Sequence, residues 1–368
     1  MMNLAVIGAS YLQLPLIEKA KEMGYVTHVF AWAANDVGEY AADHFYPVSI
    51  VEKDEILRIC RDIGICGICS IASDLAATTV NYVAYHLGLP GNSPECTRKS
   101  TNKYLMRKAF AEGNDPSPAC ILVEDASQID RTGLHFPVIV KPTDRSGSRG
   151  ICKVEKAEDL ETAVRSAISQ GFEQKALIEE YAEGKEYSVE AISCHGVHHI
   201  LAVTLKYTTG APHFIETGHM EPAPVSRELY QKIATVVIHA LDTLGIQNSA
   251  SHSEIKIDGE EHIRIIEIGG RMGGDCIGSD LVYYSTGTDF LRAVIDVACG
   301  KEPDLQPVIK PFPVEVRYIL SEEDVREYEK IKKTDRFIRT VFYRPEEVGD
   351  VTDSSNRAGC YLIRVTDT

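Results

Sequence analysis

The sequence predicts a protein of mixed α/β and α+β class, and two observations carry that prediction. Apolar strands alternate with helical patterns over residues 1–97, which is the order found in a parallel sheet. Residues 253–268 instead form two short β-like runs joined at Asp258-Gly259, which is typical of an antiparallel hairpin. With 368 residues, the chain is long enough for two or three domains and a sizeable core.

The first part of the chain predicts a regular series of elements. An apolar strand at 3–8 ends in Gly8-Ala9-Ser10, and a helical pattern follows until Gly24. Further strands are predicted at 26–32 and 63–71, and further helices around 56–60 and 80–87. We assign residues 1–97 to a Rossmann-like domain. Because Gly8-Ala9-Ser10 does not match G-x-G-x-x-G, we interpret it as a structural turn rather than a dinucleotide site.

The remaining residues predict a second domain and a smaller C-terminal region. A helix at 100–112 contains Lys103, and a strand at 136–142 contains Lys141 near its end. Ser226 has the position of an N-cap for a long helix that Gly245 closes. Other predicted elements are strands at 119–123, 176–181 and 188–193 and a helix at 160–168. We assign 98–300 to the second domain, with a lid subdomain at about 120–190, and 301–368 to a C-terminal α+β region without identified chemistry.

Composition excludes several classes of protein. The net charge of −16 argues against a nucleic-acid partner, which would need a basic face. The sequence has no apolar run of about 18 residues to span a membrane, and its first residues lack a signal-peptide pattern. The ten scattered cysteines fit reduced thiols in a cytosolic protein. We interpret the C-x-x-C of Cys66 and Cys69 as part of a buried strand rather than a redox or metal site.

Glu254 and Glu267 are the most informative pair of residues in the chain. If the hairpin loop is the four residues 259–262, their side chains lie opposite each other, with Cβ atoms about 5 Å apart. Like charges placed opposite each other destabilise a sheet, so we expect a cation between them. Carboxylate oxygens suit Mg²⁺, which usually arrives with phosphates. The pair therefore predicts a metal site beside a nucleotide.

A phosphate-binding loop is predicted directly after Lys141. Residues 143–150 are rich in glycine and serine, and Gly147 and Gly150 allow the backbone to approach a ligand closely. Successive N–H groups in such a loop can cradle phosphate oxygens, and Lys141 adds a point charge. The loop is not a Walker A pattern, and a mobile surface loop is the alternative interpretation.

A strand end at 179–186 could hold the base and sugar of a nucleotide. Its residues are Glu179-Glu180-Tyr181-Ala182, then Gly184 and Glu186. Backbone groups there could pair with an adenine edge, and a carboxylate could accept ribose hydroxyls. An acidic loop at a strand end is the alternative.

Arg271 and three other polar residues could contact the substrate. Arg271 follows Glu267 by four residues among several glycines, where a guanidinium could bind a carboxylate or a developing acyl phosphate. The alternative for Arg271 is a surface salt bridge. Glu216, His219 and His252 could also touch substrate, the alternative being hydrogen-bonded structural residues.

In this order, the segments resemble the ATP-grasp superfamily over residues 1 to about 300. The nearest likeness is to carboxylate–amine ligases of the L-amino acid ligase group. The similar segments are Phe214-Ile-Glu-Thr-Gly-His219, His252-Ser-Glu-Ile-Lys256 and Ile266-Glu-Ile-Gly-Gly-Arg-Met-Gly-Gly-Asp275. The resemblance implies a Rossmann-like leading domain followed by a two-subdomain ATP-grasp domain.

The resemblance also implies a role for each candidate residue. Lys103 and Lys141 would bind ATP phosphates, and Ser146, Gly147 and Ser148 would lie in the loop over them. Glu254 and Glu267 would carry Mg²⁺, with Mn²⁺ as an alternative, and Arg271 would stabilise an acyl phosphate. For the base and sugar, the contacts would come from Glu179, Glu180, Tyr181, Ala182 and Glu186.

Two positions depart from the family pattern. Gly269 stands where the family often has Asn, which could leave one metal ion less completely ligated. Asn102 precedes Lys103 where the family often has Asp. Neither change removes a charge that the implied chemistry needs.

The resemblance implies an activity that joins a small carboxylic acid to an amine, with both substrates resembling amino acids. ATP would activate the acid as an acyl phosphate, and ADP and phosphate would be released. The alternatives are an ATP-grasp carboxylase, a purine-pathway ligase, or an ATP-binding protein without turnover. The family likeness alone suggests a homodimer.

Overall fold

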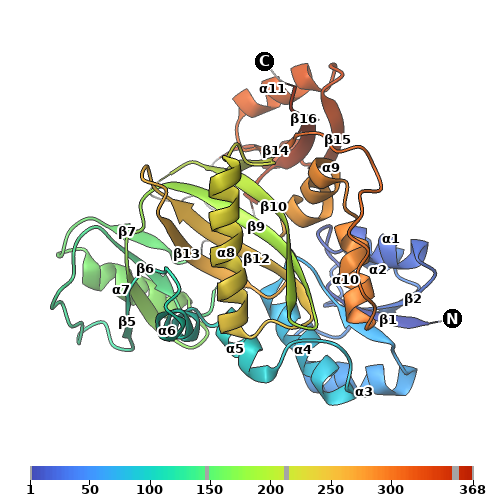
Figure 1. Cartoon of the computed structure of the whole chain (residues 1–368), viewed down its shortest axis with the longest axis horizontal. Helices are drawn as coiled ribbons and strands as arrows, with labels where there is room; N and C mark the ends of the chain where they lie inside the picture. Colours follow the sequence, from blue (N-terminus) through green and yellow to red (C-terminus); the bar gives the residue numbers. More distant parts are fainter. Residues whose placement is uncertain (1, 146–148, 211–214, 350–355, 367–368) are drawn as a thin grey trace.

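The computed structural model describes residues 2–145, 149–210, 215–349 and 356–366, and their strands form three sheets. A parallel sheet comes first in the chain, a small antiparallel sheet follows, and a large antiparallel sheet holds the centre (Figure 1). The predicted α/β and α+β class is therefore confirmed. Among the described residues, no helix has the length and apolar character needed to cross a membrane.

The leading domain is built on the parallel sheet, in the order β3-β2-β1-β4. Its strands are β1 (Asn3–Ile7), β2 (Val26–Phe30), β3 (His44–Tyr46) and β4 (Gly67–Cys69). Its helices are α1 (Leu14–Glu22), α2 (Val37–Ala41), α3 (Lys53–Ile63) and α4 (Asp74–Leu87). The strand predicted at 63–71 is shorter because α3 continues to Ile63 and ends at Gly64, whose φ of 69° lies in the left-handed region.

The prediction of one continuous helix at 100–112 is wrong, because two helices meet at Asn102. α5 (Pro94–Thr101) ends and α6 (Lys103–Gly113) begins at Asn102, whose backbone is extended. The Asn102 side chain accepts a hydrogen bond from the Leu105 N–H and caps α6. Lys103 is thus the first residue of α6.

The small sheet forms a separate subdomain, to one side of the large sheet in Figure 1. Its antiparallel strands lie in the order β5-β8-β6-β7. Helix α7 packs on this sheet, and the sheet and helix share an apolar core of their own. The elements are β5 (Cys120–Val123), β6 (Val138–Pro142), β7 (Cys152–Val154), α7 (Leu160–Gln170) and β8 (Ala176–Glu180).

The large sheet has eight antiparallel strands in the order β13-β12-β9-β10-β11-β14-β16-β15. The chain's C-terminal region supplies the last three strands and so extends this sheet. The first five are β9 (Lys185–Cys194), β10 (Val197–Thr208), β11 (Glu216–Glu221), β12 (Ser249–Ile257) and β13 (Ile263–Gly269). The last three are β14 (Val314–Ile319), β15 (Phe337–Tyr343) and β16 (Gly359–Arg364).

Helices cover the large sheet and join it to the leading domain. α8 (Arg227–Leu244) begins after the Ser226 cap and ends at Gly245, as the sequence predicts. α10 (Phe290–Ala298) packs against α1 on one side and against β9 and β12 on the other, so one apolar core spans both parts. The remaining elements are a π-helical turn at Ile277–Leu281, α9 (Val282–Thr286), α11 (Glu322–Ile331) and a 3₁₀ turn at Pro345–Glu347.

The two faces of the large sheet have different roles. Side chains alternate along a strand, so Ile255 and Ile257 of β12 pack with α8 while His252 and Glu254 face a pocket. The predicted pairing of Glu254 with Glu267 is confirmed.

The predicted loop length is wrong, because residues 258–262 form the loop and Ile257 pairs with Ile263. A bulge then restores the expected register: Ile255 pairs with Ile265, but Glu254 pairs with Glu267. As a result, the consecutive residues Ile266 and Glu267 both line the pocket.

Candidate functional site

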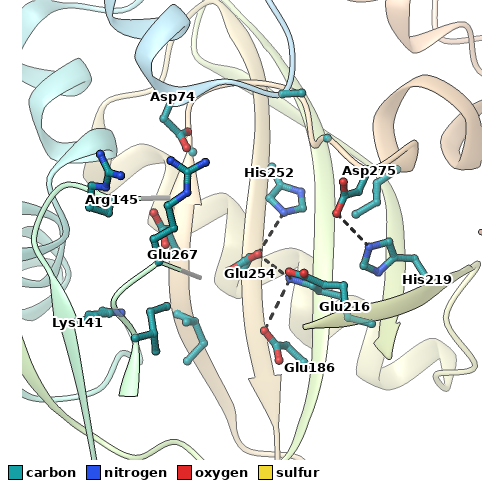
Figure 2. A pocket seen from close by; sticks show the side chains of 18 of the residues that line it. Asp74, Lys141, Arg145, Glu186, Glu216, His219, His252, Glu254, Glu267 and Asp275 are labelled. Carbon is teal, nitrogen blue, oxygen red and sulfur yellow. Dashed lines mark hydrogen bonds and ion pairs between the residues drawn. The ribbon is translucent and has the colours of Figure 1, made fainter. Parts of the chain in front are cut away.

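A pocket of about 590 Å³ lies on the face of the large sheet opposite α8. Its walls come from the large sheet, the small subdomain, the leading domain and the C-terminal region. Figure 2 shows charged side chains from several of these parts pointing into one space. The pocket therefore brings together residues that are hundreds of positions apart in sequence.

Glu254 and Glu267 lie side by side at the centre of the pocket, and each is paired with a lysine. Lys206 Nζ is 2.7 Å from Glu254 Oε1, and Lys103 Nζ is 2.7 Å from Glu267 Oε1. Burial would raise the pKa of Glu254, but Lys206 and His252 outweigh it and hold that pKa well below its usual value. Two carboxylates on adjacent strands, both reaching the pocket, form a donor set that fits Mg²⁺ or Mn²⁺.

Lys206 connects three acidic residues of the pocket floor. Its ammonium is almost fully buried on β10 and lies 3.7 Å from Glu186 and 3.8 Å from Glu216 as well as next to Glu254. Burial opposes the charged form, but these carboxylates raise the pKa of Lys206 above its usual value. Lys206 is thus a fixed positive charge that holds carboxylates from β9, β11 and β12 together.

His252 is a mostly buried residue of the pocket wall that lies next to Glu254. Its Nδ1 is hydrogen-bonded to the buried carboxylate of Glu190, and its Nε2 lies 3.6 Å from Glu254. Burial lowers the pKa of His252, but Glu190 outweighs it and the result is about 9. Glu190 also accepts a hydrogen bond from the Gly273 N–H at 2.9 Å. The His252–Glu190 pair therefore links β12 to the glycine segment after Arg271.

Lys141 and Glu179 form a buried ion pair at the end of the pocket next to the small subdomain. Lys141 Nζ is 2.7 Å from Glu179 Oε2, and Arg107 of α6 contacts the same carboxylate at 3.0 Å. Burial would raise the pKa of Glu179, but Arg107 and Lys141 hold it below its usual value. The Glu179 side chain therefore fixes Lys141, and its predicted contact with adenine stays a prediction.

The other residues predicted to bind ATP line the same end of the pocket. Lys103 also donates to the Arg145 carbonyl at 2.7 Å, so α6 is tied to the start of the glycine loop. Glu180 ends β8, Tyr181 and Ala182 follow it, and Glu186 lies near the start of β9; all four line the pocket. The predicted loop residues Ser146, Gly147 and Ser148 lie outside the described part of the chain.

Arg271 is fixed by a carboxylate of the leading domain. Its Nε lies 2.8 Å from Asp74 Oδ1 and its Nη2 lies 3.0 Å from Asp74 Oδ2, which is a bidentate pair. Asp74 is the first residue of α4. A Cβ on Gly269 would lie 3.0 Å from Asp74 Oδ1 and 3.3 Å from Arg271 Cζ. The Arg271–Asp74 pair therefore occupies the space that a side chain at 269 would need.

A second group of charges closes the far end of the pocket. Arg357 donates to both oxygens of Asp275, at 3.0 and 2.7 Å, and keeps the pKa of that carboxyl well below its usual value despite burial. His219 Nε2 lies 3.9 Å from Asp275 Oδ2 (Figure 2). Burial lowers the pKa of His219, and among the described residues neither ring nitrogen has a hydrogen-bond partner. His219 and Glu216 thus lie in one pocket with Glu254 and Glu267, as candidates for substrate contact.

The central part of the chain matches a known family. Residues 134–280 match the family model described as an ATP-grasp domain. This chain contains an ATP-grasp domain. The carboxylate hairpin and Arg271 all fall inside the matched residues, as do Lys141 and Lys206.

Two solved structures resemble the whole chain. L-amino acid ligase from Bacillus licheniformis has a TM-score of 0.84 at 22% identity, covering 99% of this chain and 93% of that one. Phosphoribosylglycinamide synthetase from Anaerococcus prevotii has a TM-score of 0.78 at 22% identity, covering 99% and 94%. At such identities the likeness concerns the fold of the ATP-grasp domain and the parts around it.

Sequence relatives match only part of their own length. Alanine–anticapsin ligase from Bacillus subtilis (strain 168) is 26% identical over 290 residues, covering 72% of this chain and 60% of the relative. Carnosine synthase 1 from Homo sapiens is 25% identical over 335 residues, covering 82% and 40%. The chain thus spans roughly half the length of the curated relatives it matches.

Several pocket residues escaped the sequence analysis. Tyr11 and Asp74 come from the leading domain, and Phe342 and Arg357 come from the C-terminal region, so all four lie outside the ATP-grasp match. The sequence analysis identified no chemistry in residues 301–368, whereas the structure brings Phe342 and Arg357 of that region into the pocket. Lys206 could have been identified from the sequence, because it is a charged residue within the apolar strand pattern of β10.

Proposed function

We propose that this protein is an ATP-dependent carboxylate–amine ligase that forms an amide through an acyl phosphate. One observation carries the proposal: a single pocket joins two buried lysines, two opposed carboxylates and a fixed guanidinium to a second, separately built charged end. The first part suits a nucleotide with its metal ion, and the second leaves a place for the molecules to be joined. The named ligases among the relatives support this assignment.

In the first step, a substrate carboxylate oxygen attacks the γ-phosphorus of ATP, and the bond to the β-phosphate oxygen breaks to release ADP. Lys103 and Lys141 neutralise phosphate charge, since both ammonium groups line the pocket. Glu254 and Glu267 would hold Mg²⁺, which when bound offsets the negative charge of the phosphates. Arg271, held by Asp74, is placed to stabilise the acyl phosphate.

In the second step, the amine nitrogen attacks the acyl carbon, and the bond from that carbon to the phosphate oxygen breaks. The amine loses a proton, and the products are an amide and inorganic phosphate. Walls from four parts of the chain surround the pocket, which helps to keep water from the acyl phosphate. A homodimer and a cytosolic location stay predictions.

ADP release from ATP and Mg²⁺ tests the proposal, measured with a library of L-amino acids in the presence and absence of bicarbonate. We expect release that depends on amino acids and does not need bicarbonate. Release that requires bicarbonate would instead favour a carboxylase. No release with any amine, together with intact ATP binding, would refute the ligase assignment.

A further inference from the structure

The far end of the pocket contains an apolar surface made by two parts of the chain that lie outside the ATP-grasp match. Tyr11 lies in the turn between β1 and α1, and Phe342 lies on β15. Their ring centroids are 4.9 Å apart, and both side chains line the pocket while remaining partly accessible. Leu12 and Ile277 line it too. Together these side chains offer an apolar substrate side chain a surface to pack against.

Fixed charges of opposite sign lie next to this apolar surface. Arg357 and Asp275 form the bidentate pair described above, and the Arg357 guanidinium lies 3.8 Å from the ring centroid of Tyr318. Asp275 and Arg357 line the same pocket as Tyr11 and Phe342. An adjacent cation and anion suit the ammonium and carboxylate groups of a zwitterion.

Arg344 closes the outer side of the apolar surface. Its guanidinium lies 5.4 Å from the Phe342 ring centroid, and it is paired with Glu347 at 3.1 Å. The Phe342 ring therefore has Arg344 and the Tyr11 ring as neighbours, and all three side chains line the pocket. A substrate side chain that packs against these two partly accessible rings would be removed from water.

We propose that one substrate of this protein is an amino acid with a large apolar side chain, which packs against Tyr11 and Phe342 while its charged groups meet Asp275 and Arg357. This inference rests on the proposed ligase function and names the substrate class of the same pocket. It assigns substrate choice to the leading domain and the C-terminal region rather than to the nucleotide-binding part.

Direct binding tests the inference without requiring turnover. Isothermal titration of the full chain with Mg²⁺ and ADP present compares L-phenylalanine, L-alanine and L-glutamate as probes. We expect phenylalanine to bind at least about tenfold more tightly than either of the others, because its ring leaves water. Tyr11→Ala and, independently, Phe342→Ala should reduce this ratio to about threefold or less, with ADP affinity unchanged.

Tyr40→Ala is the matched control, because Tyr40 belongs to the leading domain but is 76% exposed and is not among the pocket-lining residues. That variant should keep the wild-type ratio. The inference is overturned if alanine or glutamate binds as tightly as phenylalanine, if none of the three binds, or if the folded Tyr11 and Phe342 variants keep the ratio. ADP release with polar substrates alone would refute only this inference, whereas phenylalanine binding without any ADP release would refute only the ligase reaction.

Discussion

At the scale of single residues, the pocket is organised by acid–base pairs. Glu254 with Lys206, Glu267 with Lys103, and Asp74 with Arg271 each bring a carboxylate within 3 Å of a cation. Each partner reaches the pair from a different strand, helix or domain. The pairs fix the directions of side chains that would otherwise repel their neighbours.

Glu267→Gln should reduce ADP release by at least about 100-fold, because it removes one charge from the metal carboxylates. Nucleotide binding without Mg²⁺ should persist. Steady-state kinetics and ADP titration measure the two effects. Glu260→Gln is the control, since Glu260 lies on the exposed loop of the same hairpin and should keep full activity. Full activity of the Glu267 variant would exclude the metal role.

Lys206→Met should lower the free energy of unfolding by about 2–3 kcal/mol, because it leaves three carboxylates together without their cation. Urea denaturation measures this change. Lys232→Met is the matched control, because Lys232 forms an exposed pair with Glu261 and should change stability by about 0.5 kcal/mol or less. Equal effects of the two variants would show that Lys206 does not organise the site.

At the scale of elements, the end of β13 at Gly269 has no room for a side chain. Gly269→Ala would place a Cβ against the Arg271–Asp74 pair and should lower kcat about tenfold while leaving the KM for ATP unchanged. Gly259→Ala, where a Cβ would meet no atom within 4 Å, should leave kcat unchanged. A Gly269→Ala variant with wild-type kcat would contradict the role of this pair.

β11 carries a buried acid that should make stability depend on pH. Glu221 accepts hydrogen bonds from Thr204 and Ser285, each at 2.5 Å, and burial raises its pKa from 4.5 to about 8. Between these values the folded state holds a proton that the unfolded state has lost. The contribution of Glu221 is therefore fully present below pH 4.5 and is lost as pH rises to about 8.

Glu221→Gln should remove this dependence, because the amide keeps the shape and does not titrate. From pH 5 to 8, the free energy of unfolding should fall by at least about 1 kcal/mol more in the wild type than in the variant. Urea denaturation at both pH values provides the measurement. Parallel pH profiles for the two proteins would show that Glu221 is not the responsible group.

Sequence patterns predicted those elements whose chemistry lies close together in the chain. The hairpin of Glu254 and Glu267 and the caps of α8 follow from spacing and turn residues. The bulge near Ile266 does not follow from these patterns. A loop of residues 259–262 without a bulge and a loop of residues 258–262 with one both pair Glu254 with Glu267. The break at Asn102 was also missed, since a polar cap inside a helical pattern resembles a solvent-facing residue.

At the scale of the whole molecule, the pocket depends on parts that meet only after folding. Tyr11, Asp74 and Arg357 lie in an ordinary turn, a helix start and a charged terminal region, and nothing local marks them. The core around α10 joins the leading domain to the large sheet, and β14 to β16 extend that sheet (Figure 1). Sequence therefore indicated the nucleotide end and, at the opposite end, His219, whereas Tyr11, Asp74 and Arg357 required the structure.

The central claim is that a substrate carboxylate becomes an acyl phosphate. Incubating the full chain with ATP, Mg²⁺ and L-amino acids labelled with ¹⁸O in their carboxylates tests it directly. The proposed mechanism predicts that each inorganic phosphate released with ADP carries one ¹⁸O atom, because the attacking oxygen leaves with the phosphate. Mass spectrometry of the phosphate measures the label. ADP release with unlabelled phosphate would contradict the account.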